Sequence, residues 1–171
     1  IEKFSADGVR VGMLLCSPAG NDILFDESLT EQGRNFANKI WNAFRLVNSW
    51  QSDASIVQPD SARLAVEWFD HKLSETILAM DDLFSKYRIS DALMTIYTAF
   101  WQEFSAWYLE AVKPAYQQPI DAVTYRATIG YFEKLIKLLH PFMPFITEEL
   151  YQSIEQRAAG DSIMIAPWPT A

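Results

Sequence analysis

The sequence has almost none of the residues from which disulfide frameworks and metal centres are built. It contains one cysteine, Cys16, and two histidines, His71 and His140, in 171 residues. One thiol cannot form a disulfide or a thiolate zinc site within the chain. Cys16 follows two leucines, and we expect it to be a small buried hydrophobe. The composition therefore predicts no metal and no cofactor bound by this chain.

Long apolar runs and the common catalytic motifs are also lacking. No apolar run reaches the roughly 18 residues that indicate a membrane-spanning helix, and we expect a cytoplasmic protein. There is no phosphate loop of the GxxxxGK or GxGxxG type. Glu148 and Glu149 are adjacent, as are Asp81 and Asp82, and adjacent helical positions point about 100° apart, so neither pair converges as acid and base. The sequence predicts no catalytic residues.

Positive charge is scarce. The chain has 22 acidic and 14 basic residues and a net charge of −8. Phosphate contacts need cations, so this balance argues against indiscriminate binding of nucleic acid, although it leaves room for a local basic stripe. The sequence begins Ile-Glu-Lys, without methionine, and we expect it to be a segment of a longer protein.

Amphipathic helices account for most of what is present. Half of the residues are hydrophobic, enough for a substantial core in one domain. A first helix is predicted over residues 5–16, followed by a break at 17–22 and an extended stretch at 23–25. Longer helices are predicted over residues 28–51, 61–87, 90–114, 121–139 and 144–156, with a strand at 162–166. We therefore predict an all-α fold, an antiparallel helical bundle of residues 28–171, preceded by a junction segment of residues 1–27.

Capping residues and apolar spacing support these helices. Ser28 and Glu31 form a capping-box pattern, and Ser90 has the position of an N-cap. Apolar and aromatic residues recur at helical spacing in two stripes that we assign to the core. These stripes are Leu73, Ile77, Met80, Phe84 and Tyr87, and then Leu93, Ile96, Phe100, Phe104, Trp107 and Ala111.

The segment GRNFANKIWNAFR, residues 33–45, combines two helix faces of different character. One face is an ordinary apolar stripe: Phe36, Ile40, Ala43, Phe44, Val47 and Trp50. The other carries amides and cations: Asn35, Asn38, Lys39, Asn42 and Arg45. Asparagine is a weak helix former. A helix face that is only solvated is expected to carry Glu, Lys and Gln, which have higher helix propensities. Neutral donors and acceptors beside positive charge are what nucleotide bases and phosphates require.

Two neighbouring residues extend this predicted RNA-binding site. Arg34 is a further phosphate candidate. Phe36 lies beside the amide stripe, and it is either a core residue or an exposed ring that stacks on an unpaired base. Both readings of Phe36 are open from the sequence.

Four separated segments resemble valyl-tRNA synthetases, a family of class I aminoacyl-tRNA synthetases, and occur in the family's order. They are SADGVRVGMLLCSPAGNDILFDESLTEQGRNFANKIWNAFR (residues 5–45), FSAWYLEAVKP (104–114), LIKLLHPFMPFITEELYQ (135–152) and MIAPWP (164–169). Leucyl and isoleucyl enzymes are similar more loosely. The resemblance implies the helical anticodon-binding domain that follows the catalytic domain, with tRNA and the rest of the synthetase as partners.

The resemblance also implies what this chain lacks. The HIGH and KMSKS signatures of class I synthetases are missing here, and in the family both precede the matched region. We therefore expect the chain to be inactive by itself, although its parent, a valine–tRNA ligase, uses ATP and magnesium. The alternatives are the equivalent domain of an isoleucyl enzyme and an acidic helical scaffold that binds only protein. In every case we expect a monomer.

Overall fold

The chain is helical over most of its length, which confirms the predicted all-α class. The computed structural model describes residues 2–16 and 25–171. The predicted break at 17–22 and most of the extended stretch at 23–25 lie outside the described residues. The elements are α1 (Ser5–Leu15), α2 (Glu27–Asn48), β1 (Ser52–Asp53), α3 (Asp60–Ser85), α4 (Ile89–Thr98), the π-helix η1 (Ala99–Tyr108), α5 (Leu109–Val112), β2 (Ile120–Asp121), α6 (Ala122–Leu139), α7 (Pro144–Ile154) and the 3-10 helix η2 (Ile163–Ile165).

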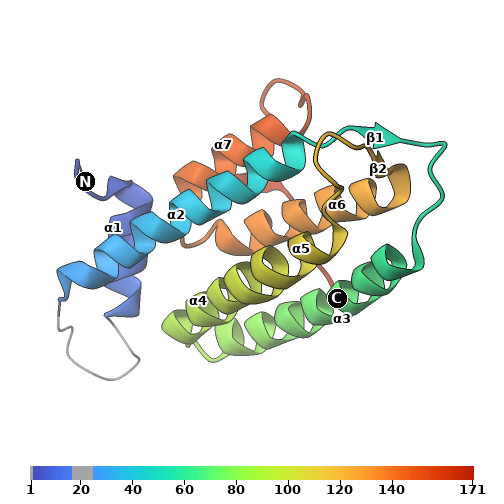
Figure 1. Ribbon diagram of the computed structural model, residues 1–171. Coiled ribbons are helices and arrows are strands. Elements are labelled where there is room, and N and C mark those ends of the chain that lie inside the picture. Colours follow the sequence, from blue (N-terminus) through green and yellow to red (C-terminus); the bar gives the residue numbers. More distant parts are fainter. Residues whose placement is uncertain (1, 17–24) are drawn as a thin grey trace.

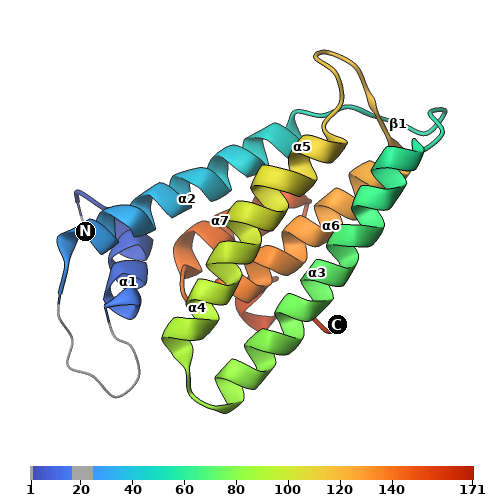
Figure 2. The ribbon, with the colours of Figure 1, turned by 60° about the horizontal axis from the view of Figure 1, so that its bottom comes forward.

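The longer helices form a bundle that α2 crosses at an angle. In Figures 1 and 2, α3, the continuous run from α4 to α5, and α6 lie side by side, and the chain turns back sharply between α3 and α4. Tyr87 takes a positive φ of 58° in that turn. Helix α1 packs against the first half of α2, at the end of the molecule away from β1 and β2.

A π-helical segment changes which residues of the second predicted stripe reach the core. Hydrogen bonds in a π-helix run from residue i to i+5, so η1 turns more slowly than an α-helix. Phe100 and Phe104 are buried as predicted, but Tyr108 is buried in place of Trp107, which is 70% exposed. The same phase shift exposes Ala111 and buries Val112. Tyr87 is also wrongly predicted to lie in the core, because α3 ends before it.

Helix ends differ from the predictions where another side chain caps better. Asp26, not Ser28, caps α2, because its carboxylate accepts a hydrogen bond from the Ser28 backbone N–H at 2.9 Å. Ser90 is not an N-cap, because its hydroxyl donates to the carbonyl oxygen of Leu14 at 2.7 Å. In place of the strand predicted at residues 162–166, Ile163–Ile165 form η2. The seryl hydroxyl of Ser162 donates to Glu148 on α7, which holds this turn against the bundle.

The predicted loop at residues 52–60 contains a strand that the sequence did not indicate. β1 pairs in parallel with β2, with Ser52 opposite Ile120 and Asp53 opposite Asp121. The backbone N–H of Ile120 also donates to the carbonyl oxygen of Gln51 at 2.9 Å. This short ladder holds the end of α2 beside the loop that precedes α6.

Contacts made through small residues fix α1 against α2. A side chain at Gly12 would come within 2.7 Å of Thr30, and one at Gly33 within 2.5 Å of the Gly8 carbonyl oxygen. Only glycine allows the two backbones to approach this closely. The contact therefore sets the angle between α1 and α2.

Polar contacts tie α1 to α7 as well. The buried carboxylate of Asp7 accepts hydrogen bonds from the backbone N–H groups of Ile146, at 2.8 Å, and Phe145, at 3.3 Å. These groups belong to the first turn of α7, where helical N–H groups lack partners and a negative charge is favourable. Arg10 donates to the carbonyl oxygens of Pro141 and Phe142 just before that helix. The start of α7 is thus capped by a residue far away in the sequence.

Candidate nucleic-acid interface

Helix α2 presents the two faces that its sequence predicts. Phe36, Ile40, Ala43, Phe44 and Val47 are all buried against the bundle. Asn35, Asn38, Asn42 and Arg45 are exposed, and Lys39 is half-buried. The amide stripe therefore lies on the surface, where a ligand could reach it. Trp50 was predicted to lie on the apolar stripe, but its indole is only half-buried. The reason is that α2 ends at Asn48, before this residue.

Phe36 must be removed from the predicted RNA-binding residues. Its side chain is 0% exposed. Its ring lies 4.5 Å from that of Tyr97 and 5.9 Å from that of Phe100, measured between centroids. Burial of a large apolar ring against other rings is favourable, and a ring in this position has no free face for a base. The core reading of Phe36 is the correct one.

The cations of α2 differ in whether a carboxylate already neutralises them. Arg34 forms an ion pair with Glu31 at 2.9 Å and lies over the ring of Phe4. Lys39 contacts the Trp101 ring, 5.5 Å from its centroid. Within the described residues, neither Lys39 nor Arg45 has a carboxylate within ion-pair distance, whereas nine other lysines and arginines do.

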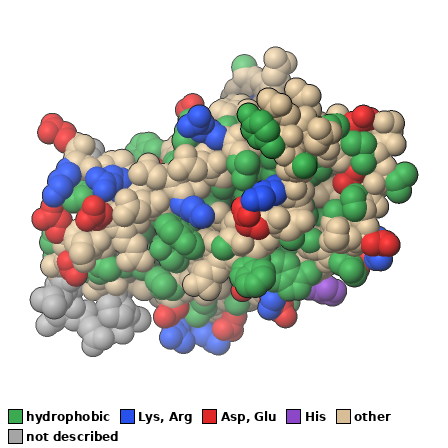
Figure 3. All heavy atoms as spheres, viewed as in Figure 1, with side chains coloured by type: hydrophobic (Ala, Val, Ile, Leu, Met, Phe, Trp, Pro, Cys, Tyr) green, Lys and Arg blue, Asp and Glu red, His purple; other side chains and the backbone are tan. Residues whose placement is uncertain are grey.

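The sequence around these two cations explains why they are unpaired. No aspartate or glutamate occurs between Glu31 and Asp53, although acidic residues outnumber basic ones in the whole chain. In Figure 3, acidic side chains gather toward the end of this face where α2 begins, and its middle carries fewer charged side chains, cations among them. The surface of α2 is therefore a local cationic and amide-rich strip on an acidic molecule.

Two hollows follow this strip toward the end of α2. The smaller, of about 160 Å³, lies between α2 and the η1–α5 run and is lined by Lys39, Asn42, Ala43, Leu46, Ser105, Leu109 and Glu110. The larger, of about 450 Å³, is lined by Leu46, Ser49, Trp50, Gln51 and residues 114–118. Leu46 belongs to both, so the two hollows adjoin. The predicted residues Lys39 and Asn42 are brought together here, whereas Asn35, Asn38, Arg34 and Arg45 line neither hollow.

Sequence reasoning missed the residues that the second hollow adds to the surface. Tyr116, Gln117 and Gln118 lie in the loop before β2, and no helical pattern marks them. A signal was present, since an exposed tyrosine and two amides stand between Pro114 and Pro119. Tyr116 is 89% exposed, which is unusual for a large aromatic side chain and typical of binding surfaces.

Outside the strip, the described residues include two ionisable groups whose pKa values are shifted by burial and hydrogen bonds. The described residues contain no group of three or more His, Cys, Asp or Glu side chains that could hold a metal ion. His140 shares a hydrogen bond of 2.8 Å with Thr147, and burial lowers the pKa of its imidazole. Burial opposes ionisation of Glu148, but hydrogen bonds from Ser162, Gln152 and Ile163 hold the pKa of its carboxyl below the usual value. Both groups join α7 to its neighbours.

Comparison with known proteins identifies the class of this domain. Residues 66–171 match the family model described as the anticodon-binding domain of tRNA ligase. The match covers more than half of the chain, and the chain belongs to this family. The all-α fold is consistent with this family match.

Several relatives that match nearly the whole chain are valine–tRNA ligases. The chain is 61% identical over 169 residues to a valine–tRNA ligase of Parabacteroides distasonis and 59% identical over 171 residues to that of Porphyromonas gingivalis. A valine–tRNA ligase of Pseudothermotoga lettingae is 36% identical over 168 residues. These matches cover 99%, 100% and 98% of the chain but only 19–20% of each relative. The chain spans about a fifth of the length of the curated relatives it matches.

The helices that the structure describes include none long and apolar enough to cross a membrane.

Proposed function

We propose that this chain is the part of a valine–tRNA ligase that holds the anticodon stem and loop of valine tRNA. The rest of the ligase would then attach valine, using ATP and magnesium, at the distant acceptor end. The observation that carries the proposal is the strip on α2, where Lys39 and Arg45 stand without carboxylate partners beside Asn38 and Asn42. Unpaired cations can meet phosphates, and amides can read the edges of splayed bases.

The relatives support the valine-specific form of this proposal over the isoleucyl alternative, because those compared above are valine–tRNA ligases. The protein-binding scaffold is less well supported, because its docking face should be apolar. Trp41 and Leu46 are partly exposed on α2, but Asn35, Asn38, Asn42 and Arg45 are exposed there as well. We propose further that the chain acts without a cofactor of its own, has no catalytic residues, is a monomer when isolated, and works in the cytoplasm with the remainder of the ligase.

The test uses two variants of the complete ligase. Asn42→Ala removes an uncharged hydrogen-bonding group and should blur discrimination between anticodons, by on the order of 1 kcal/mol for one hydrogen bond. Arg45→Ala should weaken binding of all tRNAs alike and reduce the salt dependence by about one ion. Valine activation should be unchanged in both.

Aminoacylation of tRNA with natural and altered anticodons, at several salt concentrations, separates the two effects. If both variants match the wild-type ligase in affinity, discrimination and salt dependence, this face of α2 is only solvated surface and the proposed function of the strip is wrong.

A further inference from the structure

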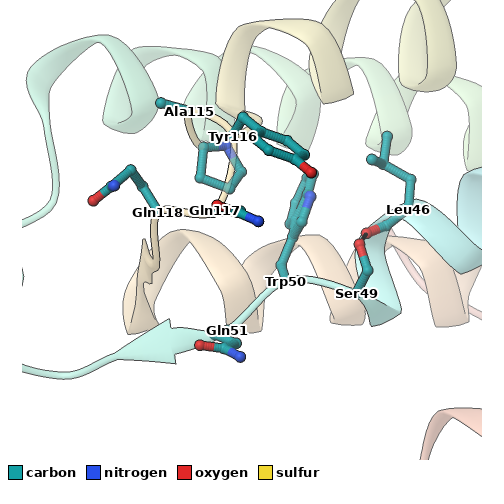
Figure 4. Close-up of a pocket in the computed structure, with 9 residues that line it drawn as sticks. Leu46, Ser49, Trp50, Gln51, Ala115, Tyr116, Gln117 and Gln118 are labelled. Atoms are coloured by element: carbon teal, nitrogen blue, oxygen red, sulfur yellow. Dashed lines mark hydrogen bonds between the residues drawn. The ribbon is translucent and has the colours of Figure 1, made fainter.

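An open groove lies on the side of the bundle away from the α2 strip. In Figures 1 and 2, the continuous run from α4 to α5 has α2 on one side and α3 on the other. The hollow in Figure 4 is on the α2 side, and its lining is uncharged. The groove on the other side, called the α3–α4 groove below, has a volume of about 580 Å³ and lies between residues 72–83 of α3 and residues 91–103 of α4 and η1. Its lining differs in character from that of the hollow.

Part of the lining of the α3–α4 groove is apolar. Leu83, Met94 and Ala99 contribute to it, and Met94 is 42% exposed. Thr76 and Thr95 add little free polarity, because their hydroxyls donate to carbonyl oxygens of their own helices, at 2.8 and 2.9 Å. Apolar side chains of a partner would therefore lose water contact favourably on entering this groove.

The apolar surface continues past the groove toward the start of α3. Lys72 and Glu103 interact electrostatically across the groove, and Trp68 and Trp107 stand about one helical turn further along the same two helices. Trp107 is 70% exposed, and Leu64 and Trp68 on α3 are 56% and 38% exposed. In Figure 3, hydrophobic side chains gather where Figure 1 places α3 beside η1 and α5. Exposed apolar side chains that cluster in this way are typical of interaction sites.

The charge of these helices is opposite in sign to that of the α2 strip. Residues 60–112, from α3 to α5, carry nine acidic and only four basic side chains. All four cations are already paired with carboxylates three or four residues away in the sequence: Arg63, Lys72, Lys86 and Arg88. Phosphates are repelled by such a surface, whereas a cationic protein segment is attracted to it.

Glu103 gives this negative charge a defined position. Its half-buried side chain lines the groove. Among the described residues it has no cation within ion-pair distance and no hydrogen-bond partner, because the ammonium group of Lys72 pairs with Glu75 instead, at 3.1 Å. A carboxylate that is partly removed from water and unpaired gains most from an incoming lysine or arginine, which would form a charge-assisted hydrogen bond with it.

The length of the groove suits one short helix. Lys72 and Leu83 both line it on α3, and their separation along the helix is about 16 Å at 1.5 Å per residue. A helix of about three turns covers that distance. Helices that bind in grooves do so through apolar anchors at positions i, i+3, i+4 and i+7.

We propose that the α3–α4 groove docks an amphipathic helix of a protein partner, one that carries lysine or arginine beside its apolar anchors. The anchors pack on Met94 and its apolar neighbours, and one cation pairs with Glu103. Protein binding on this face takes place alongside RNA binding by the α2 strip and does not depend on it.

The experiment measures, by fluorescence anisotropy, binding of two labelled peptides to the complete ligase that contains this chain. Both peptides are helical, are about 14 residues long and have leucine at i, i+3, i+4 and i+7; the other positions are lysine in one peptide and glutamate in the other. The lysine peptide should bind and the glutamate peptide should not. Glu103→Gln should weaken binding of the lysine peptide about 10-fold, as expected for one charge-assisted hydrogen bond. Met94→Gln should also weaken it, because a leucine then loses an apolar contact.

Glu149→Gln is the matched control, because it removes the same charge from an exposed position on α7 that does not line the groove. It should leave binding of the lysine peptide unchanged. If Glu103→Gln and Glu149→Gln have equal effects, the peptide responds only to overall acidity and the proposal is wrong. Equal binding of the two peptides would overturn it too, as would no binding because another part of the ligase or a second copy covers the groove.

Aminoacylation of valine tRNA distinguishes this proposal from the proposed function. Glu103→Gln and Met94→Gln should both aminoacylate as the wild-type ligase does, because the groove lies away from the α2 strip. Loss of aminoacylation in both variants would mean that this face serves the ligase itself and not a separate partner.

Discussion

A β-carbon at Gly33 would lie 2.5 Å from the carbonyl oxygen of Gly8. Backbone cannot move aside as a flexible side chain can, so Gly33→Ala would push α1 away from α2. We expect the variant to lose about 1–3 kcal/mol of free energy of unfolding, as for other overpacked interiors. Urea denaturation of the 171-residue chain measures the loss.

Gly130→Ala is the control for this prediction. Gly130 lies within α6, and a β-carbon there would meet nothing within 4 Å. Since alanine is the better helix former by roughly 1 kcal/mol, this substitution should stabilise the chain. Equal effects of the two substitutions would mean that the α1–α2 contact is not close-packed.

Removing the Asp7 carboxylate should loosen the start of α7. The Ile146 and Phe145 N–H groups would lose their buried acceptor, and loss of a helix cap costs about 0.5–2 kcal/mol. We expect Asp7→Ala to lower the free energy of unfolding by that amount and to speed hydrogen exchange of the Ile146 amide. Asp7→Asn keeps one acceptor oxygen and should show a smaller effect. Unchanged exchange at Ile146 in Asp7→Ala would contradict the assigned cap.

Stability should fall in mild acid because of His140. Burial lowers the pKa of its imidazole below the ordinary 6.5, so the unfolded chain takes up the proton more readily. The neutral imidazole therefore stabilises the folded chain above the pKa that His140 has in the unfolded state. This stabilisation is lost as the pH falls through the lower pKa that His140 has in the folded state. The denaturation midpoint should drop between about pH 7.5 and about pH 5.5. His140→Gln should show a smaller drop, and an equal drop would assign the effect to other groups.

Arg34 and Arg45 should differ in their contribution to RNA binding. Arg34 already pairs with Glu31, so a phosphate gains less from it than from the unpaired Arg45. In the complete ligase, Arg34→Ala should reduce the salt dependence of tRNA binding by less than Arg45→Ala, whose loss removes about one released ion. Filter binding across a salt series compares the two variants. A larger reduction in salt dependence for Arg34→Ala than for Arg45→Ala would contradict this prediction.

The helices could be predicted because their periodicity is local. The buried positions of α2 from Phe36 to Val47 follow from spacing alone. The misplacement of Trp107 has a specific cause, since η1 has a π-helical period that a fixed angle of about 100° per residue does not represent. Serine is a residue type that often caps helices, so Ser28 and Ser90 were reasonable candidates. Residue preference alone cannot show that Asp26 accepts the hydrogen bond that caps α2, or that the hydroxyl of Ser90 donates to the carbonyl oxygen of Leu14.

The candidate site could be predicted only as far as it lies on one helix. The exposure of Asn35, Asn38 and Asn42 follows from their position on the polar face of α2, opposite the apolar stripe. The contribution of Tyr116 depends on pairing between β1 and β2, and two-residue strands leave no alternation to recognise. Phe36 could not be assigned from the sequence, because the rings of Tyr97 and Phe100 that cover it lie about sixty residues further along the chain.

The pairing of β1 with β2 has a consequence for the order of folding. Ser52 and Ile120 can meet only after α3, α4, η1 and α5, which separate them in the chain, have taken up their places. Closing so long a loop is entropically costly until the intervening contacts exist. We therefore expect the loop that carries Tyr116 to join the end of α2, next to Trp50, late in refolding. The same junction should be among the first to open when the chain is partly denatured.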